Sequence, residues 1–452
     1  MQSDIAAVQC DAVLVQCPIA PVHCDSVPEY WRALRVQCDN LPVICAIQTV
    51  QCRVRRLDCD ILPIEERPLW DKLARMPPAA LLAGMLLMSQ PSVPPATLDY
   101  PALAERLVRH MALQPGEKVL LLSHAGEFEP LIPLLRQAVV RAGGVDLGNW
   151  QVLDPVADAK SVAASRSALS PLLRNVDLAV MLPGASPSHP EYAAMQDVLR
   201  EGHGRTIHFH WTFGGAPSAY PVPGHPLPSR EVIDATYQRA VLHSDCRAIG
   251  EIQRRFAAAL RSGEVRVTTP AGTDLRFRIG DRPVNFQDGD ASAARAREAK
   301  VLIDREIEVP CGAIRVAPLE ETVEGTIAFP PGRWADRDVE GLVLRFAAGR
   351  IVDVHARSGQ DAVEAELQEG GEPARSFREL ALGFNPELAV PPDAPWIPYY
   401  GYGTGVVRLS LGDNSELGGK VTGGYVRWNL FTDATLTAGG QVWVRDGELT
   451  VP

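Results

Sequence analysis

The chain has 452 residues, enough for two or three domains with substantial hydrophobic cores. Hydrophobic residues make up 46% of it and charged residues 22%, as is usual for a globular protein in water. Lys and Arg number 44 against 55 Asp and Glu, a formal net charge of -11, which argues against a nucleic-acid binder but allows a local basic site.

The most apolar stretch, residues 76–88, contains prolines and is shorter than the ~18–20 residues that span a bilayer. If translation began at Met76, this stretch would resemble a weak signal-peptide core, but no basic residue would precede it. We therefore expect a cytoplasmic protein with no membrane partner.

Residues 1–66 carry a repeat of cysteines, spaced by seven residues except where Trp31 takes one position: Cys10, Cys17, Cys24, Cys38, Cys45, Cys52 and Cys59. Prolines recur within the repeat and exclude a coiled coil, because proline costs ~3 kcal/mol inside a helix. The closely spaced cysteine pairs of zinc sites are absent. A thiol-rich metal-binding tail, a covalently modified segment and a translated tandem DNA repeat stay open. We favour a disordered or spurious extension, followed by a linker over residues 67–99.

Residues 100–264 predict an α/β domain. Helical periodicity at 101–113 and 130–144 flanks an apolar strand at 117–125, and two further units follow at 170–185 and 189–213. Helices that alternate with apolar strands predict a parallel sheet with helical cover. One long helical stretch, residues 230–263, then leads away from that sheet.

Residues 265–452 predict a second, mostly antiparallel β-rich domain, because short alternating strands are separated there by Gly, Asp and Pro turns. The expected fold class is therefore an N-terminal parallel-sheet α/β domain followed by a β-rich domain.

Several isolated features indicate little on their own. His208 and His210 share one face of a strand, but a metal needs three or four ligands, so we interpret them as ordinary strand-end histidines. Cys246 and Cys311 are interpreted as small buried apolar residues rather than nucleophiles. The sequence contains neither a complete P-loop nor a G-x-S-x-G nucleophile elbow.

Five segments of the second half occur in a recognisable order: TPAGTDLRFRI, EVPCGAIRVAPLEETVEGTIAF, RELALGFNPEL, GVVRLSLGDNSELGG and YVRWNLFTDATL. Together they resemble the aminopeptidase T family of metal-dependent peptidases, which is distantly related to dihydroxypyridine dioxygenases. The resemblance spans about residues 100–450. It implies a two-domain metallo-aminopeptidase fold, a homodimer, and a site in the β-rich domain.

The resemblance also implies six metal-ligand positions, of which this sequence keeps only Glu379. A second glutamate position is Ala313, two histidine positions are Arg408 and Arg427, and an aspartate position is Asn429. The expected tyrosine is missing between Arg408 and residue 420. Since a dication 4 Å from one guanidinium is disfavoured by ~8 kcal/mol at an effective dielectric of ~20, we expect that the di-metal site cannot form and that no cofactor is bound.

We predict instead that Arg408 and Arg427 occupy the metal space, with Glu379 as the nearest counter-charge. They form either a buried ion-pair plug that maintains the fold or a pocket that binds a carboxylate or phosphate through two guanidinium forks. No catalytic residue is assigned. The predicted ligand-binding set is Glu379, Arg408, Asp413, Asn414, Glu416, Arg427 and Asn429, with a small anionic ligand or a peptide as partner.

Two alternatives stay open. The chain is an active metallo-aminopeptidase that holds zinc, cobalt or manganese through a displaced ligand set, for which Glu308, Glu320, Glu321 and Asp413 are candidates. Otherwise the cysteine repeat is the functional part and the fold is its carrier.

Overall fold

The computed structural model describes residues 6–10, 13–17, 98–126, 128–152, 159–212 and 218–450. The chain divides into two compact units, Met1–Ser92 and Val93–Pro452. In the first, β1 (Ala6–Cys10) pairs antiparallel with β2 (Val13–Cys17). The rest of that unit, which holds most of the cysteine repeat, lies outside the described residues, as does the predicted linker up to residue 97.

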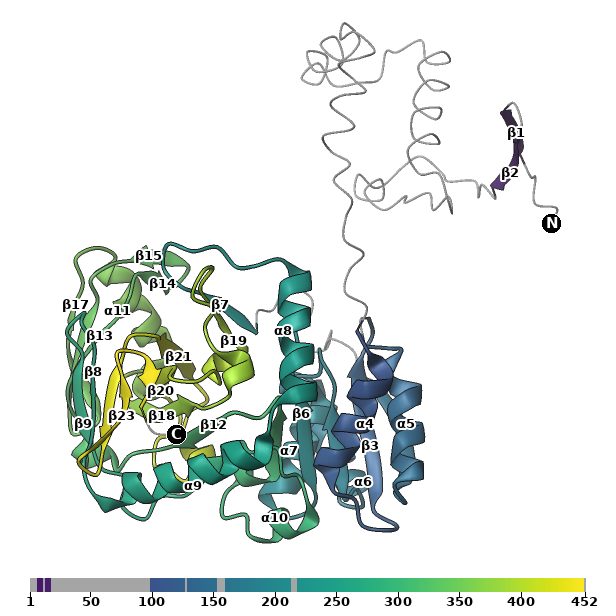
Figure 1. The fold of residues 1–452 in the computed structure, drawn as a ribbon, viewed down its shortest axis with the longest axis horizontal. Coiled ribbons are helices and arrows are strands. Elements are labelled where there is room, and N and C mark those ends of the chain that lie inside the picture. The colour runs from purple at the N-terminus through teal and green to yellow at the C-terminus, as the bar shows by residue number, and fades with distance from the viewer. Residues whose placement is uncertain are drawn as a thin grey trace, which may run out of the picture. The chain divides into compact units, whose positions relative to one another are not determined.

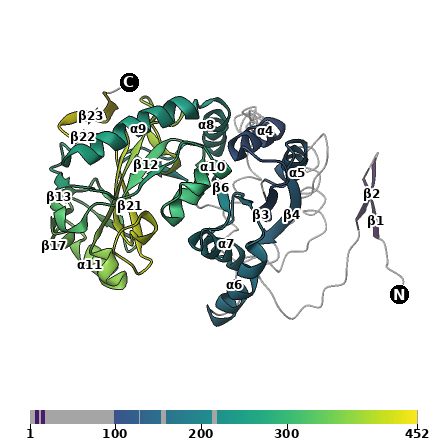
Figure 2. The ribbon, with the colours of Figure 1, turned by 90° about the horizontal axis from the view of Figure 1, so that it is seen from below.

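The second unit begins with the predicted α/β region, which the structure confirms. Its five strands are parallel, in the order β11-β6-β5-β3-β4. Helices α4 and α5 cover one face, and α6 and α7 cover the other (Figures 1 and 2). The bounds are α4 Tyr100–Met111, β3 Lys118–His124, α5 Leu131–Arg141, β4 Val145–Val152, α6 Ala159–Leu173, β5 Leu178–Met181, α7 Pro190–Arg200, β6 Arg205–Phe209 and β11 Glu306–Val309.

The sequence of β3 explains why it is an interior strand of this sheet, between β5 and β4. Val119 and Leu121 pack into the core beneath α4 and α5, whereas Leu120 and Leu122 pack into the core beneath α6 and α7. A strand buried on both faces is a continuous apolar run, as parallel sheets require.

The long helical stretch predicted over residues 230–263 is two helices, α8 (Arg230–His243) and α9 (Cys246–Ser262). The break falls at Ser244 and Asp245, and the Asp245 carboxylate accepts a hydrogen bond from the backbone N–H of Ala248 (3.0 Å). An aspartate at this position caps a new helix and satisfies one of its free N–H groups. The helical periodicity of residues 230–263 therefore predicted one helix where the structure has two.

The predicted β-rich region is also confirmed, as two antiparallel sheets. One has the order β10-β12-β18-β20-β21 and the other β17-β16-β13-β9-β8-β22-β23-β24. The first comprises β10 Val284–Phe286, β12 Ala313–Val316, β18 Phe377–Gly383, β20 Val407–Gly412 and β21 Val426–Phe431. The second comprises β8 Val265–Thr268, β9 Asp274–Phe277, β13 Glu324–Ala328, β16 Val343–Ala347, β17 Arg350–His355, β22 Thr435–Ala438, β23 Gln441–Arg445 and β24 Glu448–Leu449.

Smaller elements complete the second unit. Two short pairs, β14 with β15 and β7 with β19, lie beside the main sheets. Strand β11 lies beyond residue 264 in sequence but joins the parallel sheet. The remaining bounds are β7 Ala219–Pro221, α10 Ala293–Arg297, β14 Gly332–Trp334, β15 Arg337–Val339, α11 Gln360–Glu369, α12 Gly371–Ala374 and β19 Trp396–Pro398.

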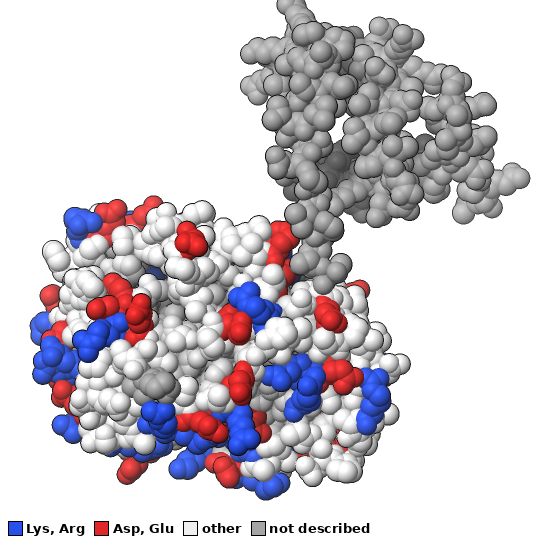
Figure 3. All heavy atoms as spheres, viewed as in Figure 1, with Lys and Arg blue, Asp and Glu red and all other residues white. Residues whose placement is uncertain are grey.

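The surface of the second unit carries charges of both signs. On the face seen in Figure 3, Lys and Arg are interspersed with Asp and Glu. Many of these residues form exposed ion pairs, such as Arg266 with Asp274 at 2.7 Å. None of the described helices combines the length and apolar character needed to cross a bilayer.

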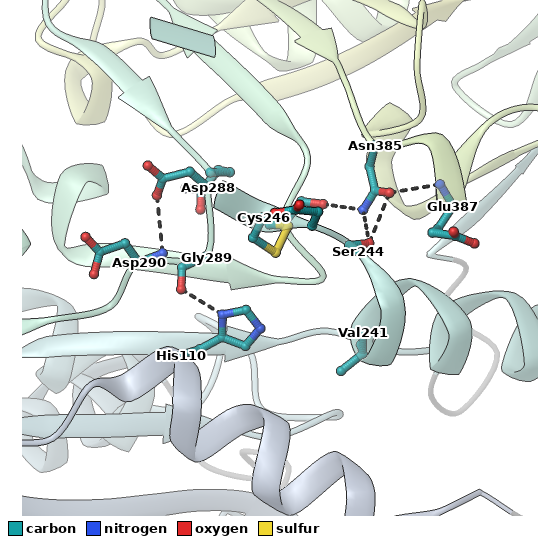
Figure 4. Close-up of a disulfide and its surroundings, with 12 residues drawn as sticks. His110, Val241, Ser244, Cys246, Asp288, Gly289, Asp290, Asn385 and Glu387 are labelled. Atoms are coloured by element: carbon teal, nitrogen blue, oxygen red, sulfur yellow. Dashed lines mark hydrogen bonds between the residues drawn. A yellow bond between two sulfur atoms is a disulfide. The ribbon is translucent and has the colours of Figure 1, made fainter. Parts of the chain in front are cut away.

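A disulfide joins the two cysteines that the sequence analysis treated as separate buried residues. Cys246, the first residue of α9, is bonded to Cys311, which lies two residues before β12 (Figure 4). Cys311 is fully buried, as expected, but its role is covalent because it ties α9 to the entrance of the sheet that carries the candidate site.

Candidate functional site

Strand alternation in the five-stranded sheet separates an apolar face from a polar one. Val407, Leu409 and Leu411 of β20 belong to the hydrophobic core of the β-rich region. The intervening residues, Arg408 and Ser410, therefore lie on the opposite face, since successive side chains of a strand alternate. We call this second face the polar face.

The antiparallel register extends the polar face across the sheet. Arg315 of β12 is paired with Ala381 of β18, and Ala381 is paired with Arg408. Glu379 is paired with Ser410 in the next row. Directly paired residues share a face, so three strands bring two cations and one carboxylate together.

Glu379 lies at the centre of this face and is fully buried. Its Oε2 accepts hydrogen bonds from Nε and Nη2 of Arg315 (3.1 and 3.0 Å). Its Oε1 accepts from Nη2 of Arg408 (2.9 Å) and from the hydroxyl of Ser410 (3.3 Å). Nε of Arg378 lies 3.7 Å from Oε2.

Glu416 supplies the second carboxylate. Its Oε1 accepts from Nη2 of Arg315 (2.7 Å) and from Nη2 of Arg378. We call these five side chains, Arg315, Arg378, Glu379, Arg408 and Glu416, the arginine–glutamate network. Three guanidinium cations against two carboxylates leave this network with one excess positive charge.

The electrostatics keep both carboxylates ionised. Burial raises the pKa of Glu379, but Arg315, Arg408 and Arg378 outweigh burial and bring it well below its usual value. Burial likewise raises the pKa of Glu416, and Arg315 and Arg378 more than offset that effect. The network is thus a set of permanent charges at neutral pH.

Arg427 does not join this network. It is paired with Leu411, an apolar-face residue, so its side chain leaves the sheet on the side opposite to Arg408. There its Nη1 donates to Oε1 of Glu366 on α11 (2.7 Å), and its guanidinium lies 3.5 Å from the ring centre of Trp334. The prediction that Arg408 and Arg427 share the metal space was therefore wrong, because it ignored the register of β21 against β20.

Asn429 also lies on that opposite face. Its amide donates to the carbonyl oxygen of Leu409 (3.0 Å), and its Oδ1 accepts from Nε of Arg427 (3.3 Å). Its side chain therefore stabilises strand pairing within the sheet, and the structure does not bring it to Glu379.

Asp413 and Asn414 hold a loop together rather than facing the network. The Asp413 carboxylate accepts from the backbone N–H groups of Ser415, Gly423 and Gly424 (2.8–2.9 Å). The buried Asn414 accepts from the N–H of Val421 (2.9 Å). The oxygen atoms of both side chains accept hydrogen bonds from backbone groups. This local role explains the many polar residues of the loop, and no bound ligand is needed to explain them.

Arg315 and Arg378 were not among the residues predicted from the sequence. Arg315 lies two residues after Ala313 on one strand, so the period of two would have placed it on the same face as a family ligand position. Arg378 directly precedes Glu379, and regular alternation would separate the two. A register irregularity between Phe377 and Glu379 breaks that alternation and gives Arg378 access to Glu416.

A second polar group lies on the parallel sheet. Glu306 and Glu308 of β11 are paired with Thr206 and His208 of β6. Nε2 of His208 lies 3.6 Å from Oε1 of Glu306, and both side chains are buried. Burial raises the pKa of Glu306 to about 8 and lowers the pKa of His208 well below its usual value, so both are largely neutral at pH 7.

The network does not fit the metal ions that the family resemblance implies. Both oxygens of Glu379 are occupied by guanidinium groups, and arginine provides no lone pair for a metal. Within the part of the chain that the structure describes, no three His, Cys, Asp or Glu side chains are placed to hold one metal ion.

The proposed displaced ligands do not converge either. Glu320 bonds Arg282, Asn414 and the N–H of Lys420, and Glu321 lies 3.8 Å from the Lys420 ammonium. Asp413 caps its loop, and Glu308 lies on another sheet. Each carboxylate has its own local role.

Comparison with known proteins agrees with this architecture. Residues 247–388 match the sequence model of the peptidase family described as thermophilic metalloprotease (M29). No curated protein sequence matches the chain.

Two solved structures share the fold. The 2,5-dihydroxypyridine dioxygenase from Pseudomonas putida KT2440 is 14% identical with a TM-score of 0.54, and the alignment covers 78% of this chain and 97% of that one. Wild-type AmpT from Thermus thermophilus is 17% identical with a TM-score of 0.53, and the alignment covers 78% and 99%.

The chain therefore has the fold of these two proteins, and part of its β-rich region is similar in sequence to the metalloprotease family. The resemblance inferred from the sequence is confirmed over residues 247–388, where the family model matches, and the chain shares the fold of AmpT.

Proposed function

We propose that this aminopeptidase T-like protein uses its arginine–glutamate network in place of a di-metal centre, and that it binds a small carboxylate ligand rather than hydrolysing peptides through two metal ions. The observation that carries the proposal is the occupation of both Glu379 oxygens by Arg315 and Arg408.

Arg408 is the residue through which the ligand would be recognised. It is 2% exposed, and its Nε has no hydrogen-bond partner among the described residues. A buried donor without a partner costs about 1–3 kcal/mol, so a carboxylate oxygen that accepts from this group would be favoured. The excess positive charge of the network favours an anion in the same way.

Trp428 provides the route to Arg408. The two residues lie on neighbouring strands, and the Arg408 guanidinium lies 5.0 Å from the Trp428 ring centre. Trp428 is 39% exposed, so it stands between the buried cation and solvent. Movement of this one side chain would let a carboxylate reach Nε of Arg408, and the indole fluorescence would report it.

The surroundings favour a ligand that also carries a hydrogen-bond donor. Half-buried Glu308 lies within electrostatic reach of Arg315 and of Tyr400, whose backbone carbonyl accepts from Nη1 of Arg408 (3.1 Å). An amino acid or a short peptide offers both a carboxylate and an amine. Acetate alone would satisfy only the arginine.

Thermal unfolding of the full chain in acetate, phosphate, glycine or glycylglycine tests the proposal. A ligand at one hundred times its Kd stabilises a protein by about 2.7 kcal/mol, so the carboxylates should raise the Tm by a few degrees. The Arg408→Lys variant keeps the positive charge but loses the planar guanidinium donors, so it should abolish the rise in Tm. Arg427→Lys, the same change on the other face, should retain it.

If the arginine–glutamate network is instead purely structural and only maintains the fold, none of the four compounds should change the Tm of any variant. The family match over residues 247–388 is the observation that favours the other candidate, a metallo-aminopeptidase with displaced ligands. That candidate predicts hydrolysis of an aminoacyl-p-nitroanilide that depends on added zinc, cobalt or manganese. Either result would contradict the carboxylate-binding proposal.

A further inference from the structure

A polar cavity opens beside the disulfide, away from the arginine–glutamate network. Its volume is about 530 Å³, and Cys246 forms part of its wall. Cys311 is fully buried behind Cys246. Of the two sulfur atoms in this bond, that of Cys246 is therefore the one that a molecule in the cavity can reach (Figure 4).

The cavity wall is rich in guanidinium groups. Arg106 donates from Nε and Nη2 to the carbonyl oxygens of Val241 and Ser244 (3.1 and 2.6 Å), which are neutral groups, and Asp245 is an acid whose charge acts on it. The Arg247 side chain is 90% exposed and lies 3.4 Å from the carboxylate of Glu251. An ion pair this exposed to water contributes little to stability. The four arginines that line the cavity are Arg106, Arg109, Arg247 and Arg254.

Three carboxylates also line the cavity, but each is already engaged. Asp245, Asp288 and Asp290 each accept a hydrogen bond from a backbone N–H two or three residues further along the chain (3.0–3.2 Å). Asp288 also pairs with Arg254 at 3.6 Å. Among the lining residues, four cations face three acids, and the partner of Arg247, Glu251, lies outside the lining.

Cys246 has a second source of positive potential. It is the first residue of α9, a helix of 17 residues, and the N-terminus of a helix carries about half a positive charge. A thiolate at such a position, close to arginines, is stabilised and is a good leaving group.

We propose that the Cys246–Cys311 disulfide is a thiol-exchange site for small anionic thiols, which enter through this cavity. The incoming thiolate attacks Sγ of Cys246 and forms a new S–S bond to it. The bond to Cys311 breaks, and Sγ of Cys311 leaves with the electron pair and takes a proton from water. The product is a mixed disulfide on Cys246 and a free thiol on Cys311.

A second thiolate completes the reaction. It attacks the small molecule's sulfur in the mixed disulfide and releases Cys246 as a thiolate at the start of α9. Two thiols are thereby oxidised to one small disulfide, and the protein disulfide gains two electrons and becomes two thiols. Alternatively, the Cys311 thiolate attacks Cys246 Sγ, the bond to the small molecule breaks, and that molecule leaves as a thiolate, which restores the original disulfide. This chemistry needs no reactant besides the thiol and stands independently of the carboxylate-binding proposal.

Reaction at Cys246 would release a tie beside the candidate site. Cys311 lies close to the start of β12, the strand that carries Arg315. Asn385 donates to the carbonyl oxygen of Cys311 (2.7 Å) and to the hydroxyl of Ser244 (2.8 Å), so hydrogen bonds hold the same junction (Figure 4). A disulfide that is exchangeable also agrees with the predicted cytoplasmic location, where disulfides are usually transient or redox-sensing.

The test follows the first mixed disulfide on the oxidised full chain by peptide mass mapping. The probes are glutathione, which is anionic, 2-mercaptoethanol, which is neutral, and cysteamine, which is cationic, at equal thiolate concentrations. Only peptides that contain Cys246 or Cys311 are scored, which sets the N-terminal cysteines aside. We expect glutathionylation on Cys246, at a rate about five-fold above that of cysteamine at low ionic strength.

Charge reversal provides the matched control. Arg109→Glu with Arg247→Glu should bring the glutathione-to-cysteamine rate ratio close to one, as should about 0.5 M salt with the unmodified chain. Arg261→Glu, a single charge reversal at the far end of α9, should leave the ratio intact. Modification of Cys311 first, no modification of either cysteine, or a ratio near one in the unmodified chain at low salt would each overturn the proposal.

Discussion

Arg408 and Arg427 lie on adjacent strands of one sheet, yet the structure holds them in opposite ways. Arg408 is 2% exposed and shares Glu379 with two other arginines. Arg427 pairs with one carboxylate, that of Glu366, and both of these side chains are about one-fifth exposed. The comparison shows that strand register decides which side chains meet, and that burial decides how much each ion pair contributes to stability.

The largest expected effect is at Glu379. In the Glu379→Gln variant three buried guanidinium groups would share only Glu416, and breaking a buried pair from one side typically costs 3–5 kcal/mol. We expect the free energy of unfolding to fall by about that amount in urea titrations, with an unchanged m-value. Glu366→Gln, the same change on the partly exposed Arg427–Glu366 pair, should cost less, about 1 kcal/mol. Equal losses would break the contrast between the two regions.

The next effect depends on pH and involves Glu306 on the neighbouring sheet. Its pKa in the folded protein is about 8, above the usual value of 4.5, because burial opposes its charged form. Because the folded protein holds this proton more tightly than the unfolded chain, protonation of Glu306 stabilises the fold. This stabilisation is fully present below about pH 4.5 and is lost as the pH rises to about 8. Between pH 6.5 and 8 the free energy of unfolding should fall by about 2 kcal/mol.

Glu306→Gln isolates that pH effect. Glutamine can keep the hydrogen bond that Glu306 accepts from Gln196 (3.0 Å) but does not titrate. The decline between pH 6.5 and 8 should therefore disappear in this variant when stability is measured by urea unfolding at each pH. A decline of the same size in the variant would show that another group is responsible.

The smallest effect concerns salt and the partly exposed Arg427–Glu366 pair. Because the Arg427–Glu366 pair is partly solvated, about 1 M NaCl should reduce the cost of Arg427→Gln from about 0.5 kcal/mol to near zero. The cost of Arg408→Gln should change little, since buried pairs are screened much less. Denaturation curves at two salt concentrations distinguish the two arginines. A strong salt response at Arg408 would mean that water reaches the network.

The sequence predicted the layers of the fold well, because periodicity reports burial directly. The buried strand β3 and the alternating strands of the β-rich region were recognisable for that reason. The break between α8 and α9 was missed because one capping residue, Asp245, interrupts a stretch that is otherwise helical in pattern.

The candidate site was predicted only in part. Glu379 and Arg408 followed from family motifs, and Glu416 joins them in the structure. Arg427 was misplaced because a strand pattern gives two faces but does not say which one a family position occupies. The Cys246–Cys311 bond joins residues 65 positions apart, and nothing in the local sequence pairs them.

The central claim is that arginines have replaced the metals, and metal binding at Glu379 tests it most directly. The full chain, with its free thiols alkylated so that the N-terminal cysteines take up no zinc, would be dialysed against zinc, cobalt or manganese and its metal content measured beside that of Glu379→Gln. We predict less than about a tenth of an equivalent in both proteins, because permanent cations oppose a dication there. One or two equivalents in the unmodified chain that are lost in Glu379→Gln would contradict it.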